Sequence, residues 1–355
     1  MIEGQTNVLS LRTGGGCLTG VGRELGRFVV TTMEIPWSIT KDLLGATPEA
    51  VLMVESMEQE VVERQIALAP ECDTVLAIGG GQAIDLGKYF SWKRGIRLVT
   101  APTILSVDAF TTPAAGLRQG HRVIYLGHAS PDPLVIDYDV IRTAPPELNI
   151  AGVGDLFSIH TASFDWKLAE SAGKSEYPFS ANTVSQASDI IEMLRKHKQD
   201  IRECNDEGLW AIVEGCMRLN TICLPAGHFR VEEGSEHYLF YELEERLQRP
   251  FTHGHIVGLG IHLMSRLQNN SPAEITGLMN EVGLLYQPRV TGITRTALTA
   301  SLLNLRSYVE SRKDLGTHGD QPKFNHTGVD RRGDRRTGIR QGMIFSMHLR
   351  RFRIL

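Results

Sequence analysis

One acid and two histidines stand at three separate places in the second half of the chain, each in a short motif that contains glycine. Asp155 ends a Gly-Val-Gly-Asp run, His237 ends Gly-Ser-Glu-His, and His253 begins His-Gly-His. Three such side chains on separate helices would hold a divalent metal and leave one position open for a substrate oxygen. That ion would polarise an alcohol so that a hydride can leave its carbon. Two alternatives are open: Asp155 as a helix N-cap, and His255 as the ligand in place of His253.

A second motif, Gly79-Gly80-Gly81, directly follows the apolar run 74–78 and precedes a predicted helix over 82–92. Glycines at the start of a helix let a bulky anion approach exposed N–H groups at the positive helix end. The motif therefore predicts a pyrophosphate site. Its spacing is not the G-x-G-x-x-G of the usual dinucleotide fold, and a tight turn without a ligand would also explain it.

Hydroxyl side chains and one acid, Asp108, crowd the segment 100–112 after the next apolar run. At the carboxyl end of a strand in an open α/β sheet, such groups can bind a ribose, a phosphate or a hydroxylated substrate. The alternative is a solvated loop in which Ser, Thr and Asp serve as turn formers.

The elements that must position these residues change in type along the chain. Short apolar runs at 27–32, 51–54, 74–78 and 97–101 alternate with helical periodicity at 58–68 and 82–92, which predicts a mostly parallel sheet. The runs 123–126 and 134–137 suggest a hairpin or edge strands that complete it. After residue 147 the pattern is predominantly helical, notably at 185–197, 208–219 and 256–268. We therefore expect a nucleotide-binding α/β domain over 1–147, a helical metal and substrate domain over 148–314, and an atypical basic tail over 315–355.

Composition excludes several classes of protein. The 355 residues include 37 basic and 41 acidic ones, and the net charge of −4 argues against a nucleic-acid partner. The five cysteines are scattered without a CxxC pair, which is typical of reduced thiols in a cytoplasmic protein. We find no signal peptide and no apolar run of roughly 18 to 20 residues, so no membrane partner is expected.

Taken in order, the motifs GGGxxxDxxK, APTxxSxDxxT, GxGD…DWxLA, GSEH and HGxxVGxG resemble the glycerol-1-phosphate dehydrogenase family. That family belongs with the iron-containing alcohol dehydrogenases, glycerol dehydrogenases and dehydroquinate synthases. The resemblance implies a Rossmann-like α/β domain, an all-α domain and a site in the cleft between them. It also implies NAD or NADP, one divalent metal (zinc, with iron or nickel as alternatives), a homo-oligomer, and interconversion of sn-glycerol 1-phosphate with dihydroxyacetone phosphate.

Carried over position by position, the resemblance assigns roles to named residues. Asp155, His237 and His253 correspond to the metal ligands and catalytic centre. The cofactor-binding positions are Gly79, Gly80, Gly81, Asp85, Thr100, Thr103 and Thr112. The substrate positions are Asp108, Asp155 and Tyr241.

The chain departs from the family at two positions. Tyr241 stands where a second histidine is usual, and the run 30–33 lacks the acid that commonly holds the adenosine ribose, which leaves NAD and NADP both open. A phosphorylated substrate needs a cationic site, for which Arg230 and Lys167 are candidates by proximity in sequence. Tyr241, His160 or His255 could assist the alcohol proton.

Three other functions remain as alternatives: a glycerol or polyol dehydrogenase on an unphosphorylated substrate, a sugar-phosphate cyclase of the dehydroquinate synthase type, and a non-catalytic relative. The cyclases typically carry a glutamate where this chain has Asp155, which favours a dehydrogenase. The atypical tail and the missing acid motivate the non-catalytic alternative, whereas the intact ligand set and glycine motif count against it.

Overall fold

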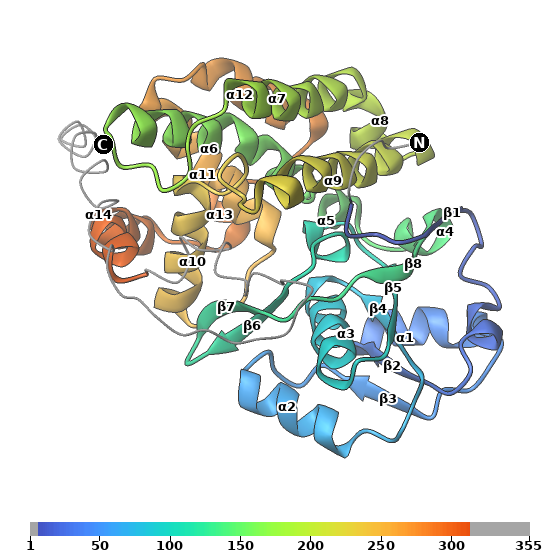
Figure 1. The fold of residues 1–355 in the computed structure, drawn as a ribbon. Coiled ribbons are helices and arrows are strands. Elements are labelled where there is room, and N and C mark those ends of the chain that lie inside the picture. Colours follow the sequence, from blue (N-terminus) through green and yellow to red (C-terminus); the bar gives the residue numbers. More distant parts are fainter. Residues whose placement is uncertain (1–5, 313–355) are drawn as a thin grey trace.

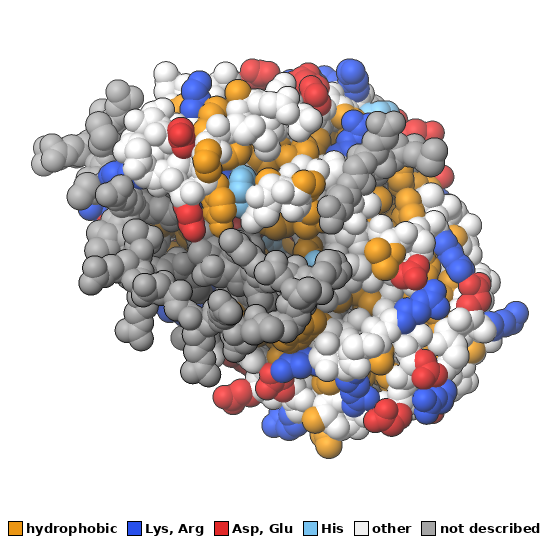
Figure 2. Space-filling model, in the orientation of Figure 1, with side chains coloured by type: hydrophobic (Ala, Val, Ile, Leu, Met, Phe, Trp, Pro, Cys, Tyr) orange, Lys and Arg blue, Asp and Glu red, His pale blue; other side chains and the backbone are white. Residues whose placement is uncertain are grey.

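The computed structural model describes residues 6–312 as an α/β part and a helical part that lie side by side (Figure 1). The expected tail over 315–355 lies outside the described residues. Acidic and basic side chains are interspersed on the face in Figure 2 and do not gather there into a patch of one sign. Within residues 6–312, no helix is both long and apolar enough to cross a membrane.

Six strands form one sheet in which every pair is parallel, in the order β1-β8-β5-β4-β2-β3. These six strands are β1 (Leu11–Gly14), β2 (Phe28–Thr32), β3 (Ala50–Met53), β4 (Thr74–Gly79), β5 (Arg97–Pro102) and β8 (Pro131–Asp137). Two further strands, β6 (Ala115–Gln119) and β7 (Arg122–Leu126), lie outside this sheet. Alternate residues of β4 enter hydrophobic cores on opposite faces of the sheet: Val75 and Ala77 on one face, Leu76 and Ile78 on the other. A strand buried on both faces is typical of a parallel sheet covered by helices. The predicted parallel sheet is therefore confirmed.

Short helices connect the strands and cover the sheet. They are α1 (Glu34–Thr40), α2 (Gln59–Leu68), α3 (Gly81–Arg94) and the 3₁₀ segments η1 (Val21–Glu24), η2 (Lys41–Leu43) and η3 (Asp108–Phe110). Helix α3 lies very close to β4, because a Cβ on Gly87 would stand 2.5 Å from the Cβ of Ala77. This contact fixes the start of α3 at the carboxyl end of β4.

We expected the runs 123–126 and 134–137 to form a hairpin or edge strands that complete the sheet, and this expectation was wrong about how the strands pair. Strand β8 is an interior strand between β1 and β5, whereas β7 pairs with β6 in a separate antiparallel hairpin. Apolar residues of β8 face both cores, which suits an interior position. The hairpin turns through Gly120 and His121, whose φ angles of 57° and 66° match the two-residue turn that hairpins favour.

After β8 the described chain is helical, as predicted, and the expected domain boundary at residue 147 falls within α5. The helices are α4 (Tyr138–Ile141), α5 (Pro146–Ile150), α6 (Val153–Ser171), α7 (Ala181–Lys196), α8 (Lys198–Glu203), α9 (Asp206–Ala226), α10 (Ser235–Leu247), α11 (His253–Gln268), α12 (Pro272–Val282), α13 (Pro288–Thr291) and α14 (Arg295–Ser311). The carboxyl ends of β4 and β5 face the first turns of α6, α10 and α11, which brings the sequence motifs of both parts together.

The hairpin β6–β7 belongs to the first part of the chain but is attached to helix α10 of the second. Arg118 forms an ion pair with Glu244 at 2.5 Å, and Arg122 pairs with Glu245 at 3.1 Å. The hydroxyl of Tyr125, on β7, lies 3.0 Å from that of another residue of α10, Tyr241. The hairpin thus forms a wall between the two parts.

Candidate active site

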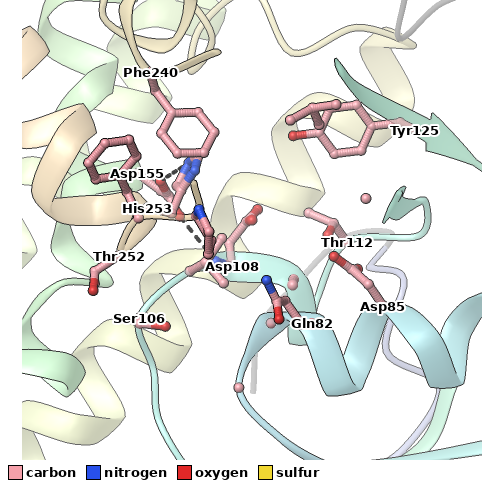
Figure 3. A pocket seen from close by; sticks show the side chains of 18 of the residues that line it. Gln82, Asp85, Ser106, Asp108, Thr112, Tyr125, Asp155, Phe240, Thr252 and His253 are labelled. Atoms are coloured by element: carbon pink, nitrogen blue, oxygen red, sulfur yellow. Dashed lines mark hydrogen bonds and ion pairs between the residues drawn. The ribbon is translucent and has the colours of Figure 1, made fainter. Parts of the chain in front are cut away.

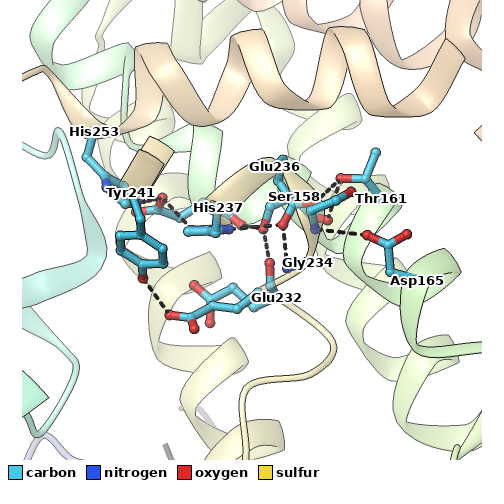
Figure 4. Close-up of polar contacts among 12 residues, drawn as sticks. Ser158, Thr161, Asp165, Glu232, Gly234, Glu236, His237, Tyr241 and His253 are labelled. Atoms are coloured by element: carbon cyan, nitrogen blue, oxygen red, sulfur yellow. Dashed lines mark hydrogen bonds and ion pairs between the residues drawn. The ribbon is translucent and has the colours of Figure 1, made fainter. Parts of the chain in front are cut away.

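Asp155, His237 and His253 come together at the junction of the two parts (Asp155 and His253 in Figure 3, His237 in Figure 4). Each lies in the first turn of its helix, α6, α10 and α11 respectively. Oδ1 of Asp155 lies 3.0 Å from Nε2 of His253 and 3.8 Å from Nε2 of His237. One ligand atom of each residue lies within 4.8 Å of the others. Asp155 did not become an N-cap, since Gly152 occupies that position of α6.

Two glycines allow the helix starts to approach each other. A Cβ on Gly254 would stand 1.7 Å from the carbonyl oxygen of Ala151, and one on Gly154 would stand 2.5 Å from the carbonyl oxygen of Gly254. Neither distance is compatible with a side chain. The glycines beside Asp155 and His253 are therefore needed for α6 and α11 to bring these two side chains together.

A buried carboxylate orients His237 (Figure 4). Nδ1 of His237 lies 3.0 Å from Oε1 of Glu236, which also accepts a hydrogen bond from the backbone N–H of Gly234 at 2.6 Å. The other oxygen of Glu236 accepts from the hydroxyl of Thr161 at 2.7 Å. Since Nδ1 is engaged, Nε2 of His237 is left to face Asp155 and His253. This arrangement is typical of histidines that bind metals.

The other two histidines considered from the sequence are engaged elsewhere. Nε2 of His255 lies 3.1 Å from the carbonyl oxygen of Glu147, on the far side of the helix start. Nε2 of His160 lies 2.7 Å from the carbonyl oxygen of Asn270. The structure brings neither into the cluster, so the alternative of His255 as the ligand loses its support.

The residues of the cluster fit a divalent metal. Oδ1 of Asp155 is buried and faces Nε2 of both histidines, while Oδ2 accepts the N–H of Asp108 at 3.1 Å. Burial raises the pKa of Asp155, but the charges and contacts of His253 and His237 outweigh it and leave the pKa below its ordinary value. A buried carboxylate with two imidazole nitrogens is a donor set that suits zinc or a related ion.

At the start of α3, on the α/β side of the cavity, the wall is formed by backbone. Gly80 and Gly81 line the cavity at the start of α3, and Gly79 lies just behind them with a φ of 146°. A Cβ on Gly80 would meet Ile104 at 2.8 Å, and one on Gly81 would meet Val107 at 2.7 Å. The glycines therefore keep the helix start open between two neighbouring side chains.

Asp85 and Thr112 also line the cavity and are linked by Lys88. Nζ of Lys88 lies 2.7 Å from Oδ1 of Asp85 and donates to the carbonyl oxygen of Ala114 at 2.6 Å. It also lies 3.4 Å from the hydroxyl of Thr112. Burial raises the pKa of Asp85, and the neighbouring ammonium group opposes this effect.

Two predicted cofactor residues, Thr100 and Thr103, are not on the cavity wall among the residues that line it. Both are buried, Thr100 within β5 and Thr103 just after it, where its N–H donates to the carbonyl oxygen of Gly79. Their side chains are buried and do not reach the cavity. Thr103 instead supports the glycine motif through its backbone hydrogen bond to Gly79.

The predicted substrate residues are also divided. Asp108 lies between the metal cluster and α3 (Figure 3), and burial together with the charge of Asp155 raises its pKa to about 8. Tyr125 lines the cavity, whereas Tyr241 lies behind it and does not. The hydroxyl of Tyr241 donates to Oε1 of Glu233 at 3.4 Å.

The cavity has a volume of about 460 Å³, within the ordinary range for small-molecule sites. Its walls come from both parts of the chain. Sequence analysis missed several of its polar and aromatic residues: Arg118, Tyr125, Glu232, Glu233, Phe240 and Glu244. For two of these residues, Glu232 and Glu233, the sequence did offer a signal, because they form a pair of acids directly before the Gly-Ser-Glu-His motif.

The lysine and arginine side chains in the cavity wall are already paired with carboxylates. Lys88 is paired with Asp85, and Arg118 with Glu244. Neither Arg230 nor Lys167, the candidates for a phosphate site, lines this cavity, and Lys167 is exposed on α6. The two positions adjoin the motifs in sequence, but neither Lys167 on α6 nor Arg230 in the loop before α10 reaches the cavity wall.

Comparison with known proteins agrees with this architecture. A family model described as iron-containing alcohol dehydrogenase matches residues 31–145. The chain is 31% identical over 240 residues to glycerol-1-phosphate dehydrogenase (NAD(P)+) of Aeropyrum pernix, covering 68% of this chain and 67% of the relative. It is 30% identical over 256 residues to the enzyme of the same name from Pyrococcus horikoshii, covering 69% and 73%.

Solved structures extend the likeness in fold. Glycerol dehydrogenase from Schizosaccharomyces pombe superimposes with a TM-score of 0.66 and 17% identity, over 98% of this chain and 92% of that one. A probable glycerol dehydrogenase from Sinorhizobium meliloti gives a TM-score of 0.64 and 21% identity, over 85% and 88%. At these identities the likeness establishes the fold.

Proposed function

Because the chain belongs to the glycerol-1-phosphate dehydrogenase family, we propose that it is a metal-dependent, NAD(P)-linked dehydrogenase that interconverts sn-glycerol 1-phosphate and dihydroxyacetone phosphate. The observation that carries the proposal is the cluster of Asp155, His237 and His253 in a cavity that also contains the glycine motif. A metal bound by these residues would polarise the reacting hydroxyl, and a nicotinamide would exchange hydride with its carbon.

The chain's own residues bind and orient the reactants in this mechanism. Gly80 and Gly81 offer backbone N–H groups at the start of α3 for a pyrophosphate. Asp108 lies between this loop and the cluster, where its carboxyl group can hydrogen-bond a hydroxyl of the substrate. Phe240 packs edge-on against His253, with ring centroids 4.3 Å apart, and limits access of water to that side.

The finer assignments follow from the donor set and the sequence. We propose zinc as the metal, since nitrogen and oxygen donors at a buried site suit it, with iron or nickel as the ions to test beside it. Either NAD or NADP is allowed, because no acid ends β2. The five cysteines are all free thiols, which supports a cytoplasmic location. A homo-oligomer is expected from the family resemblance.

The test is the oxidation of NADH and of NADPH with dihydroxyacetone phosphate, followed by absorbance. We expect turnover with at least one cofactor, its loss after chelation and its return with added zinc. Asp155→Ala is the matched control and should remain inactive after metal is added. Turnover that survives complete removal of metal would contradict the proposal.

A second candidate function is the oxidation of an unphosphorylated polyol such as glycerol. The observation that favours it is the pairing of Lys88 and Arg118 with carboxylates, which leaves neither charge unmatched for a phosphate. Comparing dihydroxyacetone with its phosphate in the same assay separates the two. A higher kcat/KM for dihydroxyacetone would favour the second candidate.

A further inference from the structure

Glu232 lies in the loop between α9 and α10, and its backbone is fixed by contacts on two sides. Its N–H donates to the carbonyl oxygen of Phe229 at 2.9 Å, and its own carbonyl oxygen accepts from the hydroxyl of Ser158 at 2.7 Å (Figure 4). Ser158 lies one turn after Asp155 on α6. The loop is thus attached to the helix that carries the cluster, and this attachment presents Glu232 to the cavity.

The carboxylate of Glu232 lacks the partners that such a group needs. The residue is 4% exposed, and Oε2 is buried with no hydrogen-bond partner among the described residues. Glu236, four positions later, shows the contrast, since its carboxylate contacts His237, Thr161 and the N–H of Gly234. A buried polar group without a partner is unfavourable, so a donor from outside the chain is expected beside Glu232.

The surroundings of Glu232 select the chemistry of that donor. Asp108, Asp155 and Glu233 lie near enough to act on the charge of Glu232. Burial is the largest cause, and the charges of Asp108 and Asp155 add to it, so that the pKa of Glu232 is raised well above its ordinary value. Acidic surroundings repel a phosphate and favour a group that donates a hydrogen. Among groups of a polyol or ketol, only a hydroxyl meets this requirement.

The metal cluster does not use Glu232. The group of residues able to hold an ion, within the described range, consists of Asp155, His237 and His253. Glu232 lines the same cavity as these three residues without belonging to the cluster.

We propose that Glu232 determines substrate specificity by accepting a hydrogen bond from the free hydroxyl adjacent to the reacting carbon. The inference rests on the proposed dehydrogenase function and adds to it a residue that recognises the end of the substrate opposite the phosphate. It also accounts for an acid pair that the sequence motifs leave unassigned.

The test compares two ketones that differ by this hydroxyl, dihydroxyacetone phosphate and hydroxyacetone phosphate. We expect the wild-type enzyme to prefer the first by roughly 10- to 100-fold in kcat/KM, the range for leaving one buried polar group without its hydrogen-bond partner. Glu232→Leu should abolish the preference while its turnover of hydroxyacetone phosphate stays within about threefold of wild type. Glu232→Gln, whose amide oxygen still accepts, should retain part of it.

Glu242→Gln is the matched control. Glu242 is a buried carboxylate on α10 that binds Arg246 and Asn304 and does not line the cavity. We expect this variant to keep the wild-type preference. The metal content of each variant, measured by mass spectrometry, should equal that of wild type.

Two results would overturn the inference while leaving the proposed function intact. Glu232→Leu could lose activity equally on both ketones, as for a residue that only supports the fold, or it could lose its metal, as for a ligand. The unphosphorylated pair, hydroxyacetone and acetone, differs by the same hydroxyl, is measured in parallel and should show the same dependence on Glu232. No turnover of either pair by wild type would instead refute the proposed function and the inference with it.

Discussion

The helical side of the cavity and its α/β side are built by different means. On the helical side, three side chains are brought together and one of them is oriented by Glu236. On the α/β side, Gly80 and Gly81 leave an opening that any side chain would narrow. The metal cluster is therefore defined by the groups present, and the start of α3 by the absence of side chains. Substitutions on the helical side should affect the metal, and those on the α/β side the cofactor.

The largest effect is expected from Asp155→Asn. This change removes the one negative charge among the three ligands, so metal binding should fail and kcat/KM should drop on the order of 1,000-fold. Metal content and NAD(P)H turnover measure the loss. Binding of NAD(P)H, followed by its fluorescence, should stay near the wild-type value, and an equal loss of cofactor affinity would break the comparison between the two sides.

Gly254→Ala tests the close approach of α6 and α11. The added Cβ would stand 1.7 Å from the carbonyl oxygen of Ala151, so the helices must separate, at a cost of about 3 kcal/mol or more in the free energy of unfolding. Gly277→Ala is the matched control, because a Cβ there, on α12, meets nothing within 4 Å. It should leave stability unchanged or raise it by up to about 1 kcal/mol. Chemical denaturation compares both, and equal stabilities would refute the packing argument.

Glu236→Gln should weaken the metal site without removing a ligand. The amide cannot supply the charge that orients His237 through Nδ1, and we expect metal affinity to fall about 10- to 100-fold. Competition with a chromophoric chelator measures the affinity. At saturating metal the variant should recover most of its turnover, whereas a permanent loss would mean that Glu236 acts on the substrate directly.

The smallest effect is expected on the α/β side. In Gly81→Ala, the added Cβ would stand 2.7 Å from a side-chain carbon of Val107, which must shift into the cavity entrance. We expect KM for the cofactor to rise about tenfold, because the helix N-terminus then offers less room for the pyrophosphate. Metal affinity, measured as above, should not change. A fall in metal affinity would show that the two sides are coupled.

The sequence predicted those features that depend on neighbouring residues. The segment from β4 through the glycines to α3 could be predicted because an apolar strand, a glycine turn and a helix follow each other directly. The interior position of β8 was not predictable, since one of its neighbours, β1, lies at the other end of the α/β part and has only four residues. Arg230 was placed near the site by its motif, but the loop does not turn it into the cavity wall. The exposure of Glu232 to the cavity depends on a hydrogen bond from Ser158, 74 positions away.

The attachment of the β6–β7 hairpin to α10 means that the boundary in space does not follow the boundary in sequence. The hairpin is held on the α/β side as well, because the N–H of Arg118 donates to the carbonyl oxygen of Met57 at 2.7 Å and the N–H of Gly120 donates to Oε2 of Glu58 at 3.0 Å. Two of its side chains, Arg118 and Tyr125, also line the cavity. A change in the separation of the two parts would have to break the hairpin's contacts on one side or the other, so the hairpin resists such a change directly beside the cavity.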